Sequence, residues 1–113
     1  RDNDGKPLTG QVPTDLSVDE AIFAARNVGL YTLVALQDAI GSLDRVEQVV
    51  RTFGMVNAAP GFTEHPRVID GFSNLFIDIF GEKGRGARSA VGMSSLPFNI
   101  PVEVEITIKI LAE

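Results

Sequence analysis

The segment from Ala87 to Ser94 contains the residue type best suited to hold a small organic acid. Arg88, Ala90 and Gly92 occupy alternate positions of a stretch that we interpret as a β-strand, so their side chains should share one face. A planar guanidinium binds a carboxylate through two parallel, charge-assisted hydrogen bonds, and small neighbours leave room for a ligand. Taken alone, the sequence favours a plainer alternative, in which Arg88 pairs with a neighbouring acidic side chain.

Glu103 is the second residue that could take part in chemistry, as an acidic side chain near a bound ligand. It stands near the start of the last predicted strand, just after a turn that contains Leu96 and Pro97. A carboxylate in this position could orient a water molecule or accept its proton as the water attacks an electrophilic carbon. The alternative is an ordinary solvent-facing strand residue, equivalent to Glu105 and Lys109 farther along the chain.

Other polar residues give weaker signals. Lys83, Arg85 and Arg88 lie among glycines, but the spacing of a phosphate-binding P-loop is missing, so we interpret this stretch as a mobile helix-to-strand connection. His65 stands beside a proline at an expected helix start and is interpreted as a surface residue. The sequence contains no cysteine, which excludes disulfides, thiolate metal sites and a cysteine nucleophile.

The composition is typical of one globular domain. With 113 residues, of which 44% are hydrophobic and 22% charged, the chain can form one sheet covered by helices on one side. A net charge of -5 repels phosphate backbones, so no nucleic-acid partner is predicted. No apolar run approaches the ~20 residues that span a bilayer, so no membrane association is predicted. Without a secretory pattern, the cytoplasm is the expected compartment.

Hydrophobic periodicity predicts two helices. A capping box at residues 17–20 should begin a helix over about 18–40, and Gly41 should end it. A second helix is predicted to begin near residues 63–66 and to stop at Gly81. The expected buried stripe of the first helix consists of Ala21, Ala25, Val28, Thr32, Ala35 and Ala39, and it is widened by Ile22, Leu33, Leu36 and Ile40.

Three strands are predicted, over residues 44–57, 87–94 and from 102 onward. The last strand alternates strictly between apolar and polar residues, which indicates a sheet covered on one side only. The order helix, strand, helix, strand, strand indicates an α+β fold with both helices on one face. Residues 1–16 are rich in turn formers and are predicted to be a surface loop.

A three-stranded sheet with one polar face would be marginal on its own. Either further strands precede Arg1, or other subunits cover the second face, or both. The face that would be covered consists of Glu103, Glu105, Thr107 and Lys109.

Several segments together resemble the Rid/YjgF family of reactive-intermediate deaminases, which was formerly grouped with the L-PSP endoribonucleases. The segments that match the family's signature are Arg88–Met93, Leu96–Pro97 and Pro101–Glu105. Residues Gly41–Val46 are similar to the approach to the family's middle strand, and Thr9–Gln11 more weakly resembles the Ser-Gly-Gln segment that lines its site. Segments typical of a longer-looped branch are Gly54–Asn57, Phe62–Thr63 and Phe80–Gly84.

The resemblance implies a chorismate-mutase-like fold for residues 1–113 as a single domain, without the family's first strand, in a homotrimer with ligand sites between subunits. It implies hydrolysis of 2-imino or enamine acids, such as 2-iminobutanoate or 2-iminopropanoate, to 2-keto acids and ammonia, with no metal or organic cofactor. By the same resemblance Arg88 binds the substrate carboxylate, Ala90 and Gly92 complete the substrate-binding set, and Glu103 is catalytic.

Two departures from the family pattern leave other functions open. Gly86 stands where the family usually has proline or alanine, and Ala90 stands where many members have cysteine, which rules out thiol chemistry there. The main alternative is a non-catalytic trimer that binds a stable carboxylate ligand. Ribonuclease activity is a third possibility, which the acidic balance and the lack of a basic, aromatic-studded face disfavour.

Overall fold

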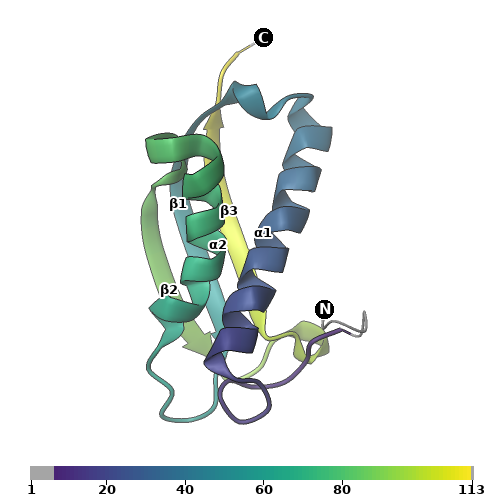
Figure 1. The fold of residues 1–113 in the computed structure, drawn as a ribbon, viewed down its shortest axis with the longest axis vertical. Coiled ribbons are helices and arrows are strands. Elements are labelled where there is room, and N and C mark those ends of the chain that lie inside the picture. The colour runs from purple at the N-terminus through teal and green to yellow at the C-terminus, as the bar shows by residue number, and fades with distance from the viewer. Residues whose placement is uncertain (1–6, 113) are drawn as a thin grey trace.

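The computed structural model describes residues 7–112, which form one sheet with two helices on the same side of it (Figure 1). The regular elements are α1 (Val18–Ile40), β1 (Val46–Asn57), α2 (His65–Phe80), β2 (Ala87–Met93) and β3 (Val102–Ile110). Each agrees with its predicted range to within two residues. The α+β fold class with both helices on one face is therefore confirmed.

The sheet is mixed, with β1 at its centre. It has the order β2-β1-β3, in which β2 pairs with β1 in parallel and β3 pairs with β1 antiparallel. Parallel neighbours need a crossover connection, and α2 supplies it between β1 and β2. Both β2 and β3 are edge strands of this sheet, so the strand that carries Arg88 has one free edge within residues 7–112.

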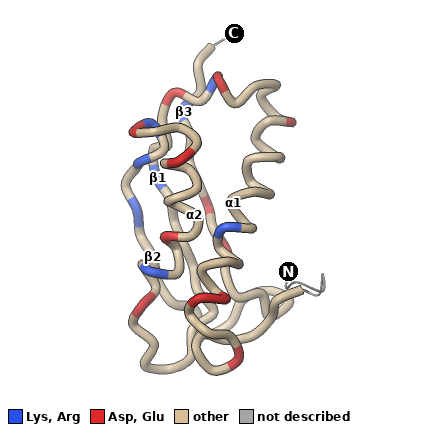
Figure 2. Tube along the Cα trace, viewed as in Figure 1, with Lys and Arg blue, Asp and Glu red and all other residues tan. Residues whose placement is uncertain are grey.

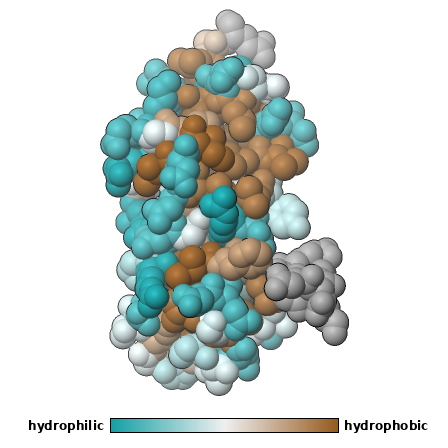
Figure 3. Space-filling view, viewed as in Figure 1, coloured by the Kyte–Doolittle hydropathy of each residue, from teal (hydrophilic) through white to brown (hydrophobic). Residues whose placement is uncertain are grey.

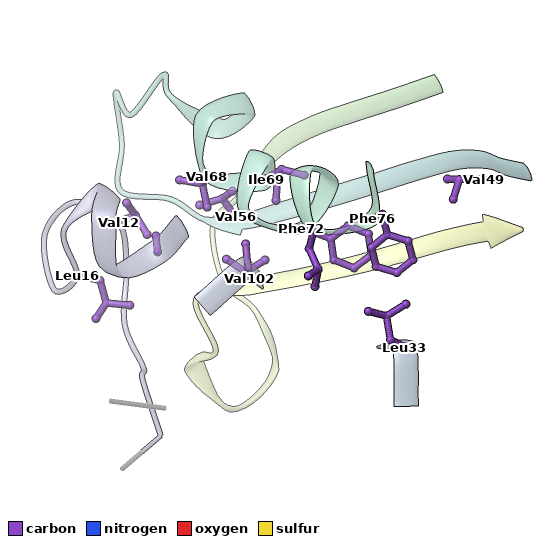
Figure 4. Close-up of a cluster of buried hydrophobic side chains, with 13 residues drawn as sticks. Val12, Leu16, Leu33, Val49, Val56, Val68, Ile69, Phe72, Phe76 and Val102 are labelled. Atoms are coloured by element: carbon purple, nitrogen blue, oxygen red, sulfur yellow. The ribbon is translucent and has the colours of Figure 1, made fainter. Parts of the chain in front are cut away.

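The hydrophobic core lies between α2 and the sheet (Figure 4). Phe72 and Phe76 stack on each other with ring centroids 4.6 Å apart, above the apolar side chains of β1 and β3. Gly54 allows this close packing, since a Cβ added there would lie only 2.5 Å from the side chain of Ile69.

The buried stripe of α1 differs from the prediction in its second half. Ala21, Ala25 and Leu33 are buried as expected, but Ala35 and Ala39 are exposed, and Gly29 is buried without having been predicted. Apart from Ala24, the buried residues follow i, i+4 spacing because α1 packs along that ridge against α2.

Toward its C-terminal end α1 leans away from α2, and apolar side chains are visible in that region of the surface (Figures 1 and 3). Within residues 7–112, neither helix has the length and apolar character that a membrane span requires.

The segment before α1 is more buried than predicted. Residues 1–6 of the expected surface loop lie outside the described residues, but Val12 and Leu16 are buried in the core. Val12 forms a parallel bridge with Ala58: its N–H donates to the carbonyl of Asn57, and its carbonyl accepts from the N–H of Ala59, both at 2.9 Å. The surface-loop prediction is wrong here because the two apolar residues extend the core beyond the end of β1.

Candidate functional site

Arg88 projects from β2 toward α2. Its Nη1 donates to Asp70 Oδ1 at 2.7 Å and to Ser73 Oγ at 3.3 Å, and its side chain is 28% exposed. Basic residues of β2 and acidic residues of α2 lie in neighbouring segments in Figure 2. The pairing with a neighbouring acid, which the sequence alone favoured, is therefore present.

The guanidinium keeps donors that this pairing does not use. The two hydrogens of Nη1 are directed to Asp70 and Ser73, and no acceptor within residues 7–112 is bonded to Nε or Nη2. An arginine has five N–H donors, and the Nε–Nη2 edge presents two of them in parallel. Ion pairing with Asp70 is thus compatible with bidentate binding of a second carboxylate on the other edge.

Farther along the same face, Gly92 lies beneath His65, the first residue of α2. A Cβ added to Gly92 would lie 2.5 Å from His65 Nε2, so this position accommodates the imidazole only because it has no side chain. Phe62 contacts the imidazole edge-on, with ring centroids 5.2 Å apart. No sequence pattern predicted this contact: His65 is partly exposed, and its ring packs against Gly92 and Phe62.

Gly92, His65 and Phe62 line an open pocket with a volume of about 380 Å³, to which Gln11 contributes from the segment before α1. The side-chain amide of Gln11 donates to the carbonyl of Ser94 at 3.3 Å, which ties that segment to the end of β2. A pocket of this size suits a small metabolite. The Thr9–Gln11 segment therefore lies beside the end of the strand that carries Arg88.

Glu103 lies on the other face of the sheet. Arg88 pairs in register with Thr52 and Glu103 pairs with Met55. Paired residues share a face and side chains alternate along a strand, so two positions three residues apart on β1 point to opposite sides. Glu103 is half-buried and has no hydrogen-bond or ion-pair partner within residues 7–112.

The turn before Glu103 is fixed by a buried asparagine at the end of β1. Asn57 Nδ2 donates to Asn99 Oδ1 at 3.0 Å and to the carbonyl of Ile100 at 3.1 Å. The backbone N–H of Asn57 donates to the carbonyl of Pro101 at 2.9 Å. These bonds hold the start of β3, and with it Glu103, against the end of β1.

One chain therefore brings Arg88, Ala90 and Gly92 onto one face but leaves Glu103 on the other. The central strand separates them, since two strand spacings amount to about 10 Å. In the connection between α2 and β2, Arg85 pairs with Glu82 at 3.4 Å. Within residues 7–112, no three or more His, Asp or Glu side chains gather as a set of metal ligands.

Comparison with known proteins gives consistent matches over most of the chain. A family profile described as "YjgF/chorismate_mutase-like, putative endoribonuclease" matches residues 3–109. Protein TCP17 of Trypanosoma cruzi is 43% identical over 107 residues, which cover 94% of this chain and 67% of that protein.

Two solved structures have the same fold. A protein of unknown function from Agrobacterium tumefaciens is 40% identical, with a TM-score of 0.89 over 91% of this chain and 67% of its own. A protein from Shewanella oneidensis, described as a "putative endoribonuclease", is 33% identical, with a TM-score of 0.87 over 91% of this chain and 68% of its own. The chain thus spans about two thirds of the length of these relatives.

Proposed function

The chain belongs to the YjgF/chorismate-mutase-like family, and on that premise we propose that it is a hydrolytic deaminase of 2-imino acids. The reaction takes a 2-iminium carboxylate and one water to a 2-keto acid and ammonium. Substrates of this class include 2-iminobutanoate and 2-iminopropanoate. The iminium carbon is already electrophilic, so the reaction needs a positioned substrate and a positioned water more than it needs a cofactor.

The observation that carries this proposal is the state of Arg88. It is the partly buried arginine of an edge strand, with one nitrogen anchored and one two-donor edge without a partner in the described chain. Such an edge matches a carboxylate in geometry and charge. The side chain of Ala90 is small, and beyond it the His65 imidazole covers Gly92 at the edge of the open pocket, so the rest of the substrate would extend from Arg88 past Ala90 toward that pocket.

The water would be activated by a carboxylate from another subunit. Glu103 of the same chain lies on the opposite face, so it cannot approach a ligand held by Arg88. We propose a homotrimer in which the open sheet face of one subunit meets the free β2 edge of the next. Glu103 of one subunit would then orient the water that attacks an imine bound to Arg88 of its neighbour.

The test is a turnover assay on the full chain. A 2-imino acid is generated in situ by an amino-acid oxidase, and a nucleophilic amine traps whatever imine survives. The proposal predicts that added protein lowers the trapped fraction and raises the yield of keto acid and ammonium. A trapped fraction that does not depend on the protein, with several aliphatic imines, would rule the proposal out.

The second candidate is a trimer that binds a stable carboxylate without turnover. The observation in its favour is that Arg88 already has a carboxylate partner, Asp70, while Glu103 lies on the far face. Saturable binding of 2-oxobutanoate without imine hydrolysis would identify it. The endoribonuclease wording belongs to the family description and to the Shewanella protein. For this chain, the net charge of -5 argues against RNA binding.

A further inference from the structure

The contacts of Arg88 differ from those of the other arginines with ion pairs in residues 7–112. Arg67 pairs with Glu64, three positions away, and with Asp19 at 3.8 Å, while Arg85 pairs with Glu82, three positions away. The side chains of Arg67 and Arg85 are 56% and 61% exposed. The pair of Arg88 with Asp70 is the shortest of these, at 2.7 Å, and the least exposed. It also joins residues 18 positions apart, on different elements.

The positions of the two acceptors, Asp70 and Ser73, indicate how they act on the Arg88 side chain. Asp70 and Ser73 are separated by three residues, so they lie on the same side of α2 in successive turns. Both accept from the same nitrogen, Nη1, and neither is bonded to Nε or Nη2. If the Arg88–Asp70 ion pair served only to neutralise charge, the hydrogen bonds to Asp70 and Ser73 would not both need to come from Nη1. Their joint effect is to fix the plane of the guanidinium and to spare one edge.

Resting on the proposed function, we propose that Asp70 and Ser73 are positioning residues that preform Arg88 as a carboxylate-binding fork. A free arginine side chain loses rotamer freedom when it binds a ligand, and holding it beforehand removes that cost from binding. The helix α2 would thus determine the affinity of a site whose ligand contacts lie on β2.

A competing interpretation of the same contacts predicts the opposite change in carboxylate affinity when Asp70 is replaced. If Asp70 occupied Arg88 as a surrogate ligand, its removal would free the guanidinium and remove a negative charge near the incoming anion. Affinity for a carboxylate would then rise. If Asp70 positions Arg88, affinity falls on the same substitution, although the charge change favours the anion.

The experiment measures 2-oxobutanoate binding by calorimetry to the full chain and to three variants: Asp70→Asn, Ser73→Ala and, as a control, Asp78→Asn. Asp78 is an exposed residue of the same helix, so its variant makes the same charge change away from Arg88. We expect Asp70→Asn to weaken binding by about tenfold and Ser73→Ala by a smaller factor. The control variant should bind like the wild type. Unchanged or tighter binding by Asp70→Asn would overturn the positioning role and leave the proposed function intact.

A second measurement separates failure of this inference from failure of the proposed function. The Nε–H signal of Arg88 in ¹⁵N NMR relaxation reports the order of the side chain without any ligand. We expect an ordered signal in the wild type and a mobile one in Asp70→Asn. If the wild type neither binds the keto acid nor hydrolyses imines, the proposed function is wrong, and so is the proposed role of Arg88 in binding a carboxylate. An Nε–H signal that is mobile in the wild type overturns the positioning role even where the keto acid binds.

Discussion

Arg88 and Glu103, the two residues with the clearest candidate chemistry, project from opposite faces of the same sheet, with β1 between them. A single subunit therefore cannot apply both side chains to one small ligand. The free edge of β2 and the open face that carries Glu103 are the two surfaces that a second subunit would have to join.

The first prediction concerns assembly. The polar face of β3 should be covered by other subunits around a threefold axis, because a three-stranded sheet with one solvent-exposed face is only marginally stable on its own. Light scattering of the full chain at micromolar concentration should give about three times the mass of one chain. A monomer at that concentration would remove the shared site, and with it the role proposed for Glu103.

The second prediction concerns the arginine. Arg88→Ala should weaken binding of a keto acid by about 2–4 kcal/mol, the cost of losing a bidentate charge-assisted pair in a partly enclosed site. Arg88→Lys should recover only part of this, since an ammonium cannot form the fork. Calorimetric titration with 2-oxobutanoate measures both. Arg85→Ala is the matched control, because it removes an exposed arginine of the same segment, and it should bind normally.

The third prediction concerns the glutamate. Glu103→Gln keeps the shape of the side chain but removes its basicity, so kcat should fall by roughly 10²-fold while keto-acid affinity barely changes. Glu105→Gln makes the same change two residues along the same strand face and should leave kcat unaltered. Steady-state kinetics of the two variants side by side decides the matter. Equal turnover by both would make Glu103 an ordinary strand residue.

The fourth prediction concerns stability. Gly54→Ala should destabilise the fold by about 1–3 kcal/mol, because the new methyl group would overlap the side chain of Ile69 in a packed core. Denaturant unfolding gives the free energy. In an Ile69→Ala background the same substitution should cost much less, since the overlapping atoms are gone. An equal cost in both backgrounds would show that the strain lies elsewhere.

Local patterns in the sequence were sufficient for most of the fold. The capping box of Ser17 and Glu20 and the alternation along β3 each depend on neighbouring residues, and both are present as predicted. The burial of Val12 was missed because it depends on a bridge to Ala58, far along the chain. The exposure of Ala35 was missed because it depends on the angle at which α1 crosses α2, which spacing within one helix does not determine.

The candidate site was less predictable for the same physical reason. Alternation correctly placed Arg88, Ala90 and Gly92 on one face, but it could not say which face lies against the helices. The contacts of Asp70 with Arg88 and of His65 with Gly92 arise from packing of α2 over β2 and have no local pattern. Only the register of both edge strands against β1 revealed that Glu103 faces away from Arg88.

The most direct test of a shared hydrolytic site is complementation between two inactive variants. Arg88→Ala and Glu103→Gln chains with different affinity tags are co-expressed, and trimers that contain both are isolated through the two tags in turn. In a cyclic trimer, each mixed assembly has one site with an intact arginine from one subunit and an intact glutamate from the next. Imine turnover should therefore return to about one third of the wild-type value per trimer, while each variant alone stays nearly inactive. Mixed trimers no more active than the two parents would contradict a site built from Arg88 of one subunit and Glu103 of another.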